Sequence, residues 1–106
     1  MYVKNKSLAT KVDLRTCDFS DFLVIDTRSR GYFLISHIKN AINVESLQRI
    51  TFIAQENQDK KILLYCHSGG TAADFGDKLI EQGLKNIYYI DDNYFNIPQD
   101  AIVQNS

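Results

Sequence analysis

Residues 61–71 read Lys-Ile-Leu-Leu-Tyr-Cys-His-Ser-Gly-Gly-Thr, and no other part of the chain is as informative. The apolar run before Cys66 predicts a buried β-strand, and apolar residues recur at helical spacing from Ala72 to Gln82. The cysteine therefore faces the free N–H groups of a Ser/Gly loop and the N-terminus of a helix. Both stabilise negative charge. We therefore expect Cys66 to be a nucleophile that holds an anionic group on its sulfur.

The rest of the chain continues this alternation of short apolar strands and helical segments. The predicted strands are 22–26, 41–44, 62–65 and 86–90, and the predicted helices are 29–35, 46–55 and 72–82. Ser46 is the expected cap of the second helix, and Gly83 is the expected cap at the end of the third. The pattern predicts an α/β domain with a mainly parallel sheet and helices on both faces.

Functional sites of such sheets gather beyond the carboxyl ends of the strands. Asp26 and Cys66 both stand at predicted strand ends. We expect the sheet to bring these two residues near one another.

Length and composition indicate one globular domain over residues 1–106. Hydrophobic residues make up 44% and charged residues 24%, which is ordinary for a folded domain. The formal net charge of −1 leaves no basic surplus for binding a phosphate backbone, so we expect no nucleic-acid partner. Residues 93–106 hold the single proline, Pro98, and end in a polar tail that is expected to be partly disordered.

The N-terminal sequence and the two cysteines both bear on the cellular compartment. The sequence from Met1 to Lys6 lacks a secretory apolar core, and no run is long enough to span a membrane, so we expect a cytoplasmic protein. Cys17 and Cys66 lie far apart, and a disulfide between them is the less expected state in a reducing cytosol. No Cys-x-x-Cys pair or Cys/His ligand set is present, so we expect no metal site.

Four segments, in order along the chain, carry a resemblance to a known family. They are Leu-Val-Ile-Asp-Thr-Arg at 23–28, His-Ile-Lys-Asn-Ala-Ile-Asn-Val at 37–44, Ile-Leu-Leu-Tyr-Cys-His-Ser-Gly-Gly at 62–70 and Gly-Leu-Lys-Asn-Ile-Tyr-Tyr-Ile at 83–90. The chain resembles a single-domain rhodanese, the sulfurtransferase module, over roughly residues 23–92. The resemblance implies the rhodanese-like α/β fold.

The resemblance also implies an activity and a site. A thiolate at Cys66 would take sulfane sulfur from thiosulfate or a persulfide donor and pass it to a thiophilic acceptor, either a small molecule or a partner protein. Neither a metal nor an organic cofactor is needed. The implied substrate loop consists of His67, Ser68, Gly69, Gly70 and Thr71, and the implied supporting residues are Asp26, Arg28 and His37.

Several of these residues have plainer interpretations. We expect Asp26 and Arg28 to form a structural ion pair, and His37 to bond to backbone near the sheet end. His67 either lends positive charge to the rim or faces solvent, and Ser68 either bonds the sulfur or caps the next helix. Thr71 is expected at the N-cap or in the first turn of the helix. Cys17 is expected to be a structural thiol, and Tyr88, Tyr89, Tyr94 and Phe95 are expected to pack.

The chain departs from the family around the site. Thr71 stands where the family often has Arg, so a guanidinium for an anionic donor is missing. Ser36, Lys39 and Asn40 replace the usual Gly, Pro and Gly, and Tyr32 replaces a frequent Glu. The Gly-rich segment and Trp that often follow the last strand are replaced by residues 91–95.

Three other functions compete with turnover of thiosulfate. One is a sulfur carrier that partner proteins load and unload, which the missing loop Arg favours. Another is a non-catalytic regulatory binding module. The third is a phosphatase or arsenate reductase, whose loops are one residue longer and need an Arg for the phosphoryl oxygens. No Arg occurs from Cys66 to Leu84, which argues against the third.

Overall fold

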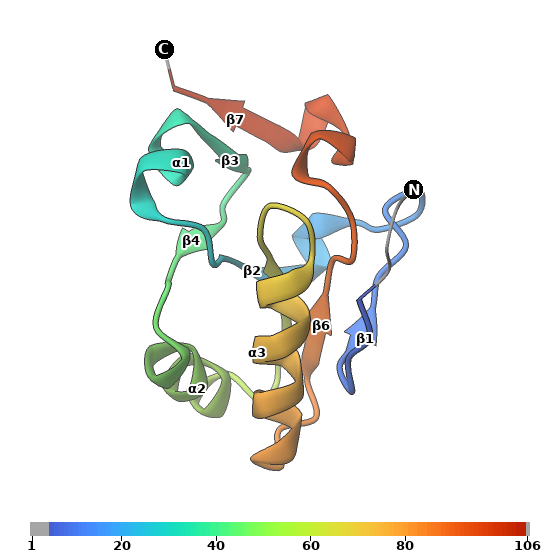
Figure 1. Cartoon of the computed structure of the whole chain (residues 1–106), viewed down its shortest axis with the longest axis vertical. Coiled ribbons are helices and arrows are strands. Elements are labelled where there is room, and N and C mark those ends of the chain that lie inside the picture. Colours follow the sequence, from blue (N-terminus) through green and yellow to red (C-terminus); the bar gives the residue numbers. More distant parts are fainter. Residues whose placement is uncertain (1–4, 106) are drawn as a thin grey trace.

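A five-stranded parallel sheet forms the centre of the computed structural model, which describes residues 5–105 (Figure 1). Its strands are β1 (Thr10–Lys11), β2 (Phe22–Asp26), β4 (Ile42–Asn43), β5 (Lys61–Tyr65) and β6 (Ile87–Tyr89), in the order β1-β6-β5-β2-β4. The two central strands pair from Phe22 opposite Lys61 to Asp26 opposite Tyr65, so both end at the same level. Four of the five residues of β5 are buried, as its unbroken apolar run predicts.

Two α-helices cover one face of the sheet. They are α2 (Leu47–Glu56) and α3 (Gly70–Glu81), and both contribute side chains to one core cluster with Ile25, Ile62 and Leu64. The Ser46 hydroxyl accepts the N–H of Arg49 at 3.3 Å, as expected of an N-cap. Gly83 has φ of +91° and follows the end of α3, which is the backbone conformation that favours glycine after a helix.

The opposite face is covered by short 3₁₀ helices and by the C-terminal segment. The 3₁₀ helices are η1 (Phe19–Asp21), η2 (Tyr94–Asn96) and η3 (Gln99–Ala101). Phe19, Tyr94 and Ala101 from these three elements join a second core cluster with Val24 and Leu63 of the sheet. The predicted α/β fold with a parallel sheet is confirmed, and helical elements lie on both faces.

A second, two-stranded sheet lies beside the short helix α1 (Arg30–Ile35). It pairs β3 (Ser36–Ile38) with the antiparallel strand β7 (Ile102–Gln104), near the same end of the molecule as the loop that precedes α3 (Figure 1). Strands β1, β3 and β7 were not predicted from the sequence. Each has only two or three residues, too few for a clear period.

The expectation of a disordered tail at 93–106 is wrong for the residues that the structure describes. Tyr94 and Ile97 are buried in the second core cluster, and Ile102 packs against it. The N–H of Asn105 donates to the carbonyl of Ile35 at 3.0 Å. Three apolar anchors thus hold a segment whose polar composition suggested a loose end; Ser106 and residues 1–4 lie outside the described part.

No helix within residues 5–105 is both long and apolar enough to cross a membrane.

Candidate functional site

Cys66 follows β5 directly and precedes α3 by a three-residue turn. It is buried, with 7% of its surface exposed, and its thiol is free. The N–H of Gly69 donates to the Cys66 sulfur with an N···Sγ distance of 3.2 Å. Gly69 adopts φ of +101°, which bends the chain so that α3 begins at the next residue. The sulfur therefore lies beside a hydrogen-bond donor and the N-terminus of a twelve-residue helix.

Fewer backbone N–H groups bond to this sulfur than the sequence suggested. The sequence predicts that several free N–H groups of the Ser/Gly loop face it. Among the described residues, only the N–H of Gly69 makes that hydrogen bond. Gly70 and Thr71 already belong to the first turn of α3, where backbone N–H groups have no partner within the helix. Those groups remain available to an anion larger than a single sulfur atom.

The other side chains of the loop, at His67, Ser68 and Thr71, are exposed. His67 is exposed, and its ring contacts Tyr32 edge-on with 4.5 Å between ring centroids. Ser68 is exposed and does not cap α3, because the N-cap residue is Gly69, which has no side chain to do so. Thr71 is exposed in the first turn of α3, one of its two predicted places.

The expected ion pair between Asp26 and Arg28 is present and buried. The Arg28 Nη2 lies 2.8 Å from Asp26 Oδ2, with side-chain exposures of 3% and 0%. The guanidinium also donates to the carbonyl of Ser36 at 2.6 Å, and it lies over the Tyr94 ring at 4.0 Å. These contacts engage the Nε and Nη2 of Arg28 and hold its guanidinium beside Asp26, on the face of the sheet away from Cys66.

Tyr65 completes this network. Its hydroxyl donates to Asp26 Oδ2 at 2.6 Å and accepts the N–H of Ile38 at 3.1 Å. Burial, and then the negative charge of Asp26, raise the pKa of Tyr65. For Arg28, burial alone would lower the pKa, but the hydrogen bonds and the charge of Asp26 outweigh it. The network thus joins the ends of β2 and β5 to β3.

Asp26 and Cys66 are close along the sheet edge but do not share a site. Asp26 pairs with Tyr65, the residue before Cys66, yet its carboxylate bonds the Tyr65 hydroxyl. Tyr65 belongs to the core cluster under η2, whereas Cys66 belongs to the cluster under α3. Because successive residues of a strand point to opposite faces, the two side chains lie on different sides of the sheet. The sheet thus brings Asp26 and Cys66 near one another, as expected, but on opposite faces.

His37 takes the structural place expected for it. Its Nδ1 lies 2.8 Å from the carbonyl of Phe33, and the two rings stack with centroids 4.0 Å apart. It therefore ties α1 to β3.

Tyr94 contacts both the Cys66 loop and Arg28, which the sequence did not predict. Its N–H donates to the carbonyl of His67 at 2.8 Å, and its ring covers Arg28. Tyr94 thus links the Cys66 loop to the Asp26–Arg28 network. Phe95, by contrast, is 84% exposed, so the expectation that it packs is wrong. The adjacent aromatic residues Tyr94 and Phe95 in a polar stretch were the available signal for a buried contact. The sequence does not tell which of the two rings is buried.

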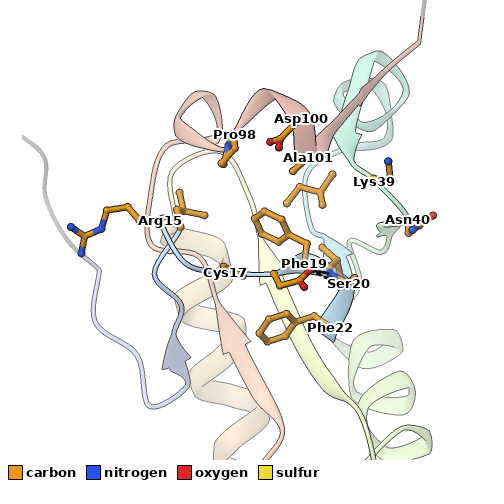
Figure 2. A pocket seen from close by; sticks show the side chains of 14 residues that line it. Arg15, Cys17, Phe19, Ser20, Phe22, Lys39, Asn40, Pro98, Asp100 and Ala101 are labelled. Carbon is orange, nitrogen blue, oxygen red and sulfur yellow. Dashed lines mark hydrogen bonds between the residues drawn. The ribbon is translucent and has the colours of Figure 1, made fainter.

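Cys17 lies apart from this site, in a pocket of about 570 Å³ on the sheet face under η1 and η3. Figure 2 shows the pocket among the rings of Phe19 and Phe22, the side chains of Lys39 and Asn40, and the segment around Pro98. Burial, and then the charges of Asp18 and Asp21, raise the pKa of Cys17. These surroundings disfavour a thiolate at this position.

The described residues hold no group of three or more His, Cys, Asp or Glu side chains that could bind a metal ion.

Comparison with protein families and curated proteins gives a consistent set of relatives. The family profile described as "Rhodanese-like domain" matches residues 8–98, a longer range than the 23–92 of the four quoted segments. The thiosulfate sulfurtransferase GlpE of Vibrio cholerae is 25% identical over 83 residues, covering 74% of this chain and 78% of that protein. The tRNA uridine(34) hydroxylase of Photorhabdus laumondii is 30% identical over 80 residues, covering 70% of this chain. The chain spans only 23% of that hydroxylase.

Solved structures share the fold. Protein hp1203 from Helicobacter pylori superposes with a TM-score of 0.79 at 25% identity, covering 90% of this chain and 89% of that one. The reduced CoADR-RHD of Bacillus anthracis superposes with a TM-score of 0.71 at 24% identity, and there the match covers 90% of this chain but 18% of the larger protein. The same unit therefore occurs both alone and as a small part of longer chains.

Proposed function

Because the chain belongs to the rhodanese-like domain family, we propose that it is a sulfurtransferase that carries sulfane sulfur on Cys66. The observation that supports this best is the N–H of Gly69 directed at the Cys66 sulfur, at the start of α3. The N–H donor and the helix N-terminus stabilise negative charge on the Cys66 sulfur before transfer, and the helix N-terminus also favours the negative charge of the outer persulfide sulfur after transfer.

The proposed reaction has two displacements. The Cys66 thiolate attacks the outer sulfur of thiosulfate or of a persulfide. A new S–S bond forms, the old one breaks, and sulfite or a thiolate leaves with the bonding pair. A thiophilic acceptor then attacks the outer sulfur of the Cys66 persulfide and releases the Cys66 thiolate. Electrons balance without an added oxidant or reductant.

The roles of the loop follow from this scheme. In this scheme the free N–H groups in the first turn of α3 donate hydrogen bonds to the terminal sulfur of a persulfide or to the oxygens of thiosulfate. His67, which follows Cys66, contacts Tyr32 beside this loop. Thr71 leaves the loop without a guanidinium, and Arg28 cannot replace it because it is engaged with Asp26.

The missing guanidinium at Thr71 favours a second form of the function, a carrier whose persulfide is exchanged with partner proteins. A small dianion such as thiosulfate gains most from a bidentate Arg. A persulfide on a partner protein is also held by contacts between the two proteins, so it depends less on an Arg in the loop. The tRNA-directed activity of the hydroxylase relatives is a weaker candidate, because this chain spans 23% of such a protein and has a net charge of −1.

Turnover of thiosulfate and cyanide to thiocyanate tests the proposal, with Cys66→Ser as the control. Thiocyanate is expected from the wild type and not from Cys66→Ser, and equal product from both would refute the assignment. A protein that gains one sulfur atom at Cys66 but makes little thiocyanate is the carrier.

Thr71→Arg sharpens this test. If the missing guanidinium limits the use of thiosulfate, the variant will consume it faster than the wild type does, while its loading from a persulfide donor will change little. An unchanged thiosulfate rate would show that Thr71 does not set donor preference.

A further inference from the structure

The peptide between Ser68 and Gly69 is held at both of its polar ends. Its N–H donates to the Cys66 sulfur at 3.2 Å, and its carbonyl accepts a long hydrogen bond of 3.4 Å from the side-chain amide of Asn5. A trans peptide is planar, with its C=O and N–H on opposite sides. Whatever holds the carbonyl therefore also fixes the direction in which the N–H points.

Asn5 is in turn held by a buried carboxylate. The backbone N–H of Asn5 lies 3.1 Å from each oxygen of Asp91, and its side-chain Nδ2 lies 3.1 Å from Asp91 Oδ1. A carboxylate only accepts, so the amide must turn its NH₂ group toward Asp91. The same NH₂ group then reaches the carbonyl of Ser68. The Asp91 side chain is fully buried, with Lys11 Nζ 3.7 Å from it.

Two more contacts fix this arrangement. The hydroxyl of Tyr89 donates to the Asn5 carbonyl at 3.1 Å. Burial, followed by the charges of Asp91 and Asp77, raises the pKa of Tyr89, which keeps this donor protonated. A Cβ on Gly69 would lie 2.8 Å from Asp91 Oδ1 and 3.2 Å from Asn5 Nδ2. The outer side of the turn is thus filled by Asn5 and Asp91.

We propose that Asn5 is a positioning residue for Cys66: its amide, oriented by Asp91, holds the Ser68–Gly69 peptide with the N–H directed at the sulfur. Without Asn5 the peptide is free to rotate, and its N–H then points away from the sulfur. The carbonyl bond also polarises the peptide, which strengthens its N–H as a donor. The inference deepens the proposed function, on which it rests for the sulfur that Cys66 would carry.

The competing explanation is that Asn5 merely fastens the N-terminal segment to the domain. Ser7 and Leu8 do so as well: the Ser7 hydroxyl donates to the Ala73 carbonyl at 2.9 Å, and the Leu8 N–H donates to Asp77 Oδ1 at 2.6 Å. Neither bond touches the Ser68–Gly69 peptide. Ser7→Ala is therefore a matched control, since it removes a fastening bond of the same segment and leaves the peptide alone.

The experiment compares Asn5→Ala, Asp91→Asn and Ser7→Ala in a Cys17→Ala background, which leaves Cys66 as the single thiol. The chain has five glycines, so ¹⁵N-glycine labelling gives a simple amide spectrum in which Gly69 can be followed. The second readout is the rate at which iodoacetamide alkylates Cys66 at one fixed pH. Thermal unfolding of each variant records the change in stability.

Asn5→Ala and Asp91→Asn are expected to move the Gly69 amide signal and to slow alkylation about threefold, as for the loss of a modest hydrogen bond. Ser7→Ala is expected to lower stability without changing either readout. The proposal is overturned if Asn5→Ala leaves both as in the wild type, or if Ser7→Ala changes them equally. Neither readout needs turnover, so a wild type that forms no persulfide would refute the proposed function and not the role of Asn5.

Discussion

Replacing Gly69 by alanine tests the geometry of the Cys66 loop in the folded protein. Gly69 has φ of +101°, and an added Cβ would lie 2.8 Å from Asp91 Oδ1 and 3.0 Å from the Asp91 Cα. The second contact is with backbone, so the neighbour cannot simply rotate away. The loop itself must shift, and the N–H of Gly69 must leave the Cys66 sulfur.

Gly83 offers a matched control for the magnitude. It has a similar φ of +91°, but no atom lies within 4 Å of its added Cβ. Gly83→Ala therefore pays only for the left-handed backbone, about 1–2 kcal/mol. Gly69→Ala loses the same backbone term, and the overlap of its Cβ with Asp91 adds about 1–3 kcal/mol, for a total loss of about 2–5 kcal/mol. The difference between the two variants isolates the contact with Asp91.

Urea unfolding of both variants measures these losses, and iodoacetamide alkylation in a Cys17→Ala background measures the state of Cys66. We expect the larger loss of stability, and slower alkylation, for Gly69→Ala alone. Equal losses in the two variants, with Cys66 reacting at the wild-type rate in both, would refute the tight packing of the loop on Asp91.

Three further predictions follow from buried groups elsewhere in the fold. Arg28→Met leaves Asp26 buried without its Arg partner and should lower the free energy of unfolding in urea by about 3–5 kcal/mol. Arg15→Met breaks the same Asp-x-Arg pairing at an exposed site and should leave that free energy measurably unchanged. Because the pKa of Tyr65 is raised in the folded state, the unfolded chain loses that proton first, and stability should fall as pH rises above about 10. Tyr65→Phe should flatten that decline, and an unchanged slope would contradict the shift. Because the pKa of Cys17 is raised, Cys17 in a Cys66→Ser background should react more slowly with iodoacetamide at pH 8 than after unfolding in urea, and equal rates would contradict this.

The sequence was most informative where local pattern and burial agree. The run Ile62 to Tyr65 gave a buried strand, and the Ser46 and Gly83 caps marked helix ends that the structure places as expected. The pairing of Asp26 with Arg28 followed from a carboxylate at the end of a strand and an arginine two residues later. Each of these features depends on contacts among near neighbours, or on a period that a short window can show.

The remaining features depend on contacts between distant segments. Asn5 meets Asp91 across 86 positions, and Tyr94 covers Arg28 from a stretch that reads as polar tail. The placement of Asp26 and Cys66 on opposite faces follows from the register of β2 and β5, in which Asp26 pairs with Tyr65. A short strand such as β7 exists because β3 is there to pair with it, and no window of sequence contains both.

The intact mass of the protein after incubation with a persulfide donor tests the central claim most directly. The wild type and Cys17→Ala are expected to gain the mass of one sulfur atom, to lose it on addition of cyanide, and to release thiocyanate. Cys66→Ser is expected to gain nothing. A wild type that stays at its original mass, or a gain that survives in Cys66→Ser, would contradict the assignment of Cys66 as the sulfur-carrying residue.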